Sequence, residues 1–95
     1  MLKEFFNDLL DEIQKLRIEI GPTAALTAKE LNSAEQHIKM LLLYLERSPS
    51  QRVKSVVKSS WAYVNKTGKT LRLFDKYKGN EALRAELIKF LDSGY

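Results

Sequence analysis

The residues best suited to chemistry are a single histidine and one tripeptide that matches part of a phosphate-binding motif. Di-iron helical bundles need pairs of Glu-x-x-His, whereas His37 follows its nearest glutamate by only two residues. Gly68-Lys69-Thr70 matches the last three positions of a P-loop, which also needs a preceding strand and a glycine where Tyr63 stands. We therefore expect His37 to be structural or solvated, and the tripeptide to be a turn or part of a helix.

Acidic residues near the N-terminus offer a second chemistry, because two neighbouring carboxylates can act as acid and base. Asp11 precedes Lys15 by four residues, however, which is the spacing of an ion pair on a solvated helix face. The chain has no cysteine and one histidine, which excludes thiolate chemistry and multi-histidine metal sites. We expect no enzyme activity, no metal and no cofactor. The acids considered for this chemistry are Asp8, Asp11, Glu12 and Glu19, all within the helix predicted over residues 2–20.

A dense group of cations in the second half of the chain is the strongest positive signal. Residues 49–79 contain eight Lys or Arg and one acid, Asp75. If the third helix is continuous through Gly68, five of these cations fall within about 60° of one another on a helical wheel. If it breaks there, the stripe becomes two patches. Such a stripe suits a polyanion, namely nucleic acid, an anionic lipid surface or an acidic protein. The five candidate binding residues are Lys54, Lys58, Lys69, Arg72 and Lys76.

The second predicted helix has more apolar surface than one core-facing stripe requires. Residues 40–45 form the longest unbroken apolar run of the chain. Met40, Leu43 and Tyr44 lie off the face that carries the other apolar residues of this helix. Such a helix is either central in its bundle, which we favour, or buries a second face against another chain. Met40, Leu43 and Tyr44 are therefore the candidate protein interface, and self-association through them stays open.

Helical periodicity runs along the whole sequence, and no segment has the alternation of a strand. Gly21-Pro22 ends the first helix, and a capping box of Thr27 and Glu30 starts the second. Ser48-Pro49 starts the third, and Gly79-Asn80 precedes the last. The predicted fold is all-α, a small antiparallel up-and-down bundle of four to five helices in one domain, 1–95. The predicted helices are roughly 2–20, 27–47, 49–66, 69–78 and 81–92.

The composition is that of an ordinary folded protein. The 95 residues carry a net charge of +4, with 44% hydrophobic and 29% charged residues, which argues against disorder. The longest apolar run is far shorter than the roughly twenty residues of a membrane-spanning helix. The N-terminus lacks the basic and then apolar pattern of a signal peptide. We expect a cytoplasmic protein without a membrane span.

In the absence of a catalytic constellation, the spare apolar surface and the one-sided charge favour a binding module. We expect a non-enzymatic, small helical protein–protein interaction module with a regulatory, adaptor or immunity-type role. The chain resembles the bacteriocin immunity proteins in its size, its helical class and its lack of cysteine, and no site residue carries over. The expected partner is another protein. The alternative is polyanion or nucleic-acid binding through the basic stripe on residues 52–78.

Overall fold

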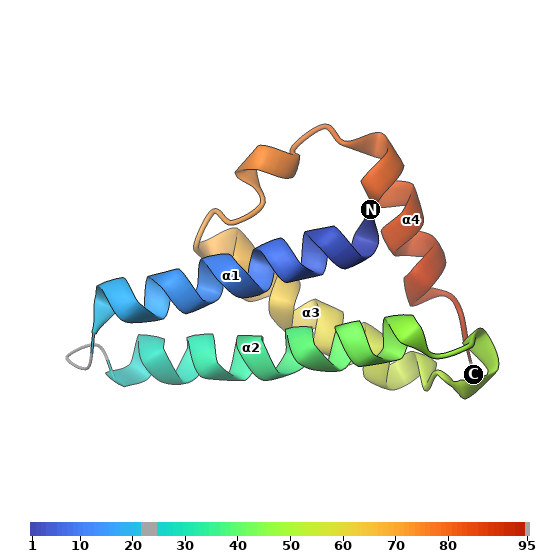
Figure 1. Ribbon diagram of the computed structural model, residues 1–95, viewed down its shortest axis with the longest axis horizontal. Coiled ribbons are helices and arrows are strands. Elements are labelled where there is room, and N and C mark those ends of the chain that lie inside the picture. Colours follow the sequence, from blue (N-terminus) through green and yellow to red (C-terminus); the bar gives the residue numbers. More distant parts are fainter. Residues whose placement is uncertain (22–24, 95) are drawn as a thin grey trace.

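The structure is a computed structural model that describes residues 1–21 and 25–94. No strand occurs in these two ranges. Short 3₁₀ turns, Pro49–Gln51 and Asp75–Tyr77, lie in the connections before and after the third helix. The predicted all-α fold, a small bundle, is confirmed (Figure 1). The described part of the chain has four α-helices: α1 (Leu2–Ile20), α2 (Ala25–Glu46), α3 (Lys54–Thr70) and α4 (Glu81–Leu91).

Helix α2 lies between two neighbours. It runs antiparallel to α1, and α3 returns along another side of it, behind α2 in the view of Figure 1. The short α4 crosses the end of the bundle where α1 begins. There the backbone N–H of Leu2 donates to Glu86 Oε1 at 3.2 Å. Three long helices in up-and-down order therefore make the body of the fold, and α4 closes one end (Figure 1).

The core is built from the apolar stripes that the helical period predicts. Leu31, Ile38 and Leu41 of α2 are fully buried. Burying a side chain of this size contributes about 1.5–3 kcal/mol relative to leaving it in water, so the core-facing stripe of α2 is a large part of the stability. The buried apolar residues are Leu2, Phe5, Phe6, Leu9 and Ile13 of α1, Leu31, Ala34, Ile38 and Leu41 of α2, Val57 and Val64 of α3, and Leu83 and Phe90 of α4.

The C-terminus of α2 is closed by an arginine from the connection that follows it. Arg52 Nε donates to the carbonyl oxygen of Tyr44 at 3.0 Å, and Nη2 donates to that of Leu45 at 3.2 Å. The last carbonyls of a helix have no partner within the helix, and a cation there also complements the helix dipole. Arg52 is extended (φ −91°, ψ 133°), so α3 starts only at Lys54. The guanidinium turns inward over the Phe90 ring, 5.0 Å from its centroid, which takes Arg52 out of the predicted basic stripe.

Helix α3 is continuous through Gly68 and ends two residues later. Arg72 adopts a φ of 57°, and its N–H bonds to the Lys69 carbonyl at 3.2 Å. The N–H of Leu73 bonds to the Gly68 carbonyl at 2.9 Å. This pair of bonds is a Schellman motif, which ends a helix with one residue in the left-handed conformation. The predicted helix over 69–78 is therefore wrong, because the chain turns away at Arg72.

Other predicted boundaries are displaced by a few residues. Helix α2 begins at Ala25, so Thr27 lies inside its first turn and does not cap it. Ser48-Pro49 starts a 3₁₀ turn and not α3, and the Ser48 side chain makes no cap bond. The Asn80 cap of α4 is confirmed, since its side chain accepts a first-turn backbone N–H at 3.0 Å. Local cap signals thus place the starts of α2 and α3 only to within a few residues.

Candidate functional site

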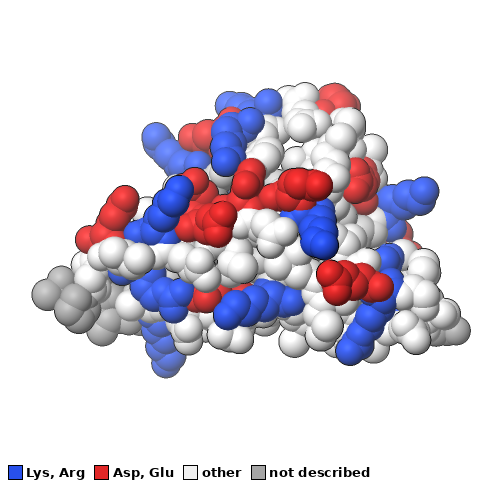
Figure 2. Space-filling view, in the orientation of Figure 1, with Lys and Arg blue, Asp and Glu red and all other residues white. Residues whose placement is uncertain are grey.

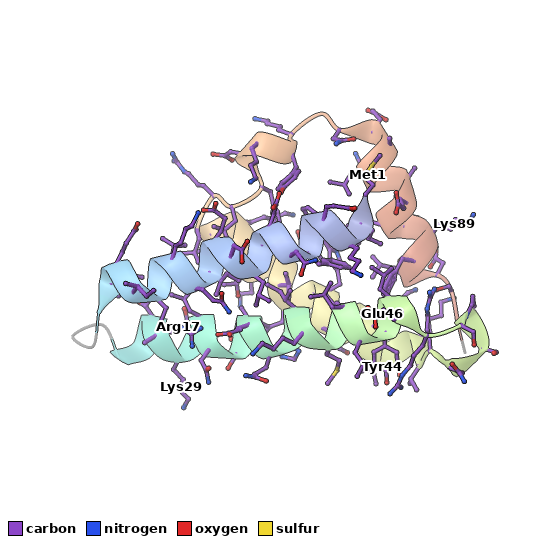
Figure 3. The ribbon with its side chains drawn as sticks, viewed as in Figure 1. Met1, Arg17, Lys29, Tyr44, Glu46 and Lys89 are labelled. Carbon is purple, nitrogen blue, oxygen red and sulfur yellow. The ribbon has the colours of Figure 1, made fainter. Side chains whose placement is uncertain are left out.

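The third side of α2 carries apolar side chains that no other described residue covers fully. Because α1 and α3 occupy two sides of α2, residues that point away from both reach solvent. Met40 is 40% exposed and Leu43 is 52% exposed, and Tyr44 is partly buried beside them. Leu43 and Tyr44 follow Met40 by three and four residues, which places them on either side of it, and the three together form a broad apolar ridge about 100° wide. Figure 3 shows Tyr44 pointing away from α1.

Met40 lies between Leu43 and Tyr44 around the helix, and its thioether also contacts α3. Ser60 Oγ donates to Met40 Sδ at 3.6 Å, and His37 Nδ1 lies 3.4 Å from the same hydroxyl. The rings of His37 and Tyr63 pack with their centroids 4.8 Å apart. These contacts place His37 in the packing between α2 and α3. They also hold the thioether of Met40 in position while the rest of its side chain stays accessible.

Two cations lie on the same stripe of α2 as this ridge. Arg47 follows Met40 by seven residues and Lys29 precedes it by eleven, so both are within about 20° of it around the helix. The guanidinium carbon of Arg47 lies 5.0 Å from the centroid of the Tyr44 ring, which is a cation–π distance. In Figure 3, Lys29 points away from α1, as Tyr44 does. We call Lys29, Met40, Leu43, Tyr44 and Arg47 the α2 outer face.

Two acids of α2, Glu35 and Glu46, point toward α1 and not toward the outer face. Glu46 lies 3.7 Å from Lys3 Nζ. Glu35 is buried and paired with Arg17 of α1. Burial opposes the ionisation of Glu35, but hydrogen bonds, the largest from Gln14, and the charge of Arg17 outweigh it and lower its pKa. In Figure 2 the acids gather over α1, and the lower edge formed by α2 is largely white between blue groups.

The five cations of the predicted polyanion site do not share one helical arc. Helix α3 ends before Arg72, so the wheel that aligned all five does not apply. Two of them form ion pairs, Lys58 with Asp92 at 3.4 Å and Lys76 with Asp8 at 3.5 Å. Their charges are thereby partly balanced by carboxylates. The five residues are Lys54, Lys58 and Lys69 on α3 and Arg72 and Lys76 beyond its end.

The remaining motifs of the sequence have structural positions. Gly68-Lys69-Thr70 forms the last turn of α3, whereas a P-loop lies between a strand and a helix. In residues 1–21 and 25–94, no group of three or more histidines or acids is arranged to hold a metal ion. The helices of those residues include none that is long and apolar enough to cross a membrane.

Two cations of the α2 outer face, Lys29 and Arg47, were not among the residues expected from the sequence. The sequence does contain a signal for Arg47 and Lys29, because each is separated from Met40 by close to a whole number of helical turns. Arg52 has no such signal, since it lies in a connection and its side chain turns inward. Comparison of the chain with protein-family models, with curated protein sequences and with solved structures finds no match.

Proposed function

We propose that this chain is a non-enzymatic protein-interaction module, with an adaptor or regulatory role, that docks an amphipathic helix of a partner protein on the α2 outer face. The observation that carries the proposal is the exposure of Met40 and Leu43 on a helix that already packs against two others. Covering apolar side chains of this kind removes them from water and favours association. Exposed apolar surface with a polar rim is typical of protein interfaces.

The shape of the face favours a helical partner. Met40 has the i, i+3 spacing of a helix ridge with Leu43 and the i, i+4 spacing with Tyr44, and such rows pack into the grooves between side chains of another helix. The side chain of Arg47 lies along the Tyr44 ring, which extends the apolar contact to the end of α2. A partner helix with apolar residues at spacings of three and four would match this ridge.

The charge of the face favours an acidic partner. Lys29 and Arg47 are its only charged members, and both are cations. Complementary charge speeds association and selects against wrong partners. A second copy of this chain would bring the same two cations and no carboxylate to the contact. We therefore propose a partner helix with acids beside its apolar residues.

Site-specific photo-cross-linking in the cells that express the protein tests the proposal. A benzophenone side chain at Leu43 should cross-link to one protein, and the linked segment should be an acidic amphipathic helix. The same group at Ile18 of α1, which is 81% exposed, should not give this product. A link to a second copy of the chain, a link to nucleic acid, or no product beyond the Ile18 control would reject the proposal.

Titration of the purified partner then measures each contact. Leu43→Lys and Met40→Lys should each weaken binding about tenfold or more, because each removes about 1.4 kcal/mol or more of apolar burial. Ile88→Lys, which changes a half-exposed isoleucine of α4, should leave the affinity unchanged. The melting temperatures of Leu43→Lys and Ile88→Lys should stay close to that of the wild type, since both positions are half exposed. Met40→Lys also removes the acceptor of the buried Ser60 hydroxyl and should lower the melting temperature.

Charge reversal separates protein docking from the polyanion alternative. Arg47→Glu should weaken binding of the partner strongly at low salt and less at high salt. Lys54→Glu and Lys69→Glu, which reverse predicted polyanion contacts, should leave partner affinity unchanged. If the lysine variants lose the partner and Arg47→Glu keeps it, the basic stripe and not the α2 outer face is the binding surface.

A further inference from the structure

We propose that a pocket between the start of α2 and the end of α3 binds a small zwitterion with an aliphatic body, of the size of a free amino acid. This inference does not depend on the proposed docking of a partner. The pocket has a volume of about 210 Å³. Sites for drug-sized ligands run from about 300 to 1,000 Å³, so this pocket is too small for a nucleotide.

Opposite charges line the two walls of the pocket. Glu30 comes from α2, and Lys66 comes from α3. Neither forms an ion pair with the other or with another described residue. A ligand that carries an ammonium group and a carboxylate could pair with both walls at once. Charge-assisted hydrogen bonds of this kind are about twice as strong as neutral ones.

The floor of the pocket is apolar and its rim carries hydroxyls. Leu31 is fully buried at the base, and Leu71 is partly buried beside it. Thr27 lies on the α2 side and Thr67 on the α3 side. A few converging polar groups over an apolar floor are the general character of small-molecule sites. Leu71 would contact an aliphatic side chain, and the threonines would bond the carboxylate or the ammonium group.

Helix capping does not account for Thr27 and Glu30, two of the polar side chains of the pocket. Thr27 and Glu30 have the spacing of a capping box, but α2 starts at Ala25, ahead of both. Lys66 lies on the exposed side of α3, and the hydroxyl of Thr70 donates to its backbone carbonyl at 3.0 Å. That bond uses the carbonyl and leaves the Lys66 ammonium group available to a ligand.

Titration of the ¹⁵N-labelled protein with L-leucine, followed by NMR, tests the inference. Leucine should give saturable shifts at the amides of Leu31, Thr67 and Leu71. N-acetyl-L-leucine lacks the ammonium group and L-leucinamide lacks the carboxylate. Each should bind about tenfold more weakly, which corresponds to the loss of one charge-assisted contact. The absence of saturable shifts at millimolar leucine, or equal affinity for all three compounds, would overturn the proposal.

Charge-neutral variants assign the two ends of the ligand. Glu30→Gln should lose the preference for leucine over N-acetyl-leucine, and Lys66→Gln should lose the preference over leucinamide. Glu81→Gln and Lys69→Gln neutralise exposed charges outside the pocket and should keep both preferences. Melting curves of all four variants should match the wild type, since the changed side chains are exposed. Unchanged preferences in Glu30→Gln and Lys66→Gln would also overturn the proposal.

Discussion

The ring of Phe74 lies against the α-carbon of Gly68, in the last turn of α3. A Cβ on residue 68 would stand 2.5 Å from Cε2 of that ring, whereas carbon atoms pack best at about 3.5–4.0 Å. The ring centroid of Phe74 is also 6.0 Å from that of Phe5 and 5.9 Å from that of Trp61. Gly68 therefore admits the aromatic side chain that holds the connection after α3 onto α1.

Gly68→Ala should destabilise the protein by about 1–3 kcal/mol, because the added methyl group overpacks the contact with Phe74. Helix propensity alone predicts the opposite sign, since alanine is favoured over glycine within a helix by about 1 kcal/mol. Chemical denaturation measures the change. Ser59→Ala, at an exposed position of α3, is the control and should not destabilise. In the double variant, Phe74→Leu should restore part of the stability that Gly68→Ala loses. A Gly68→Ala protein as stable as the wild type would contradict the packing argument.

Arg52→Ala should cost about 2 kcal/mol or more, because it leaves the last carbonyls of α2 without their charged donor. The side chain also donates to Ser93 Oγ at 2.6 Å, so the end of α4 should loosen together with the end of α2. Amide hydrogen exchange should be faster near the C-terminal ends of both α2 and α4. Arg47→Ala removes an exposed guanidinium a few residues away and should change stability by less than about 0.5 kcal/mol. Equal effects of the two substitutions would show that the Arg52 cap contributes little.

Glu35 should make stability depend on pH in the acid range. Its folded-state pKa is lowered from the ordinary value of 4.5, so the unfolded chain takes up the proton first as the pH falls. The contribution of the carboxylate is therefore complete above about pH 4.5 and is lost as the pH falls through the lower, folded-state pKa.

Glu35→Gln should lower the free energy of unfolding at pH 7 by about 2 kcal/mol, since Arg17 loses its buried partner. The variant should also lose part of the slope of stability against pH below pH 5, and denaturation at a series of pH values measures both. Glu19→Gln, at an exposed position of α1, should keep the wild-type slope. A Glu35→Gln protein with the full acid slope would show that another carboxylate is responsible.

Local signals in the sequence were enough for the fold class and for several helix ends. The apolar period and Gly21 predict α1 as observed, Leu2–Ile20, and Asn80 predicts the start of α4. The period also places Met40, Leu43 and Tyr44 off the core-facing stripe of α2, but it did not decide whether the packing would leave them exposed. These features depend on residues within a turn or two of one another, so no knowledge of distant contacts is needed to predict them.

The tertiary structure decided the features that depend on contacts between residues far apart in the chain. The periodicity through Gly68 predicted a helix over 69–78, but the chain turns at Arg72 and Phe74 returns over Gly68. A stripe of cations was expected, but Arg52 caps α2, and Lys58 and Lys76 meet carboxylates from other helices. A helical wheel describes the angle of a side chain on its own helix and not what lies opposite it. The sequence by itself therefore determined which faces of the helices are apolar or charged, and the packing of the helices determined which of those faces stay open to a partner.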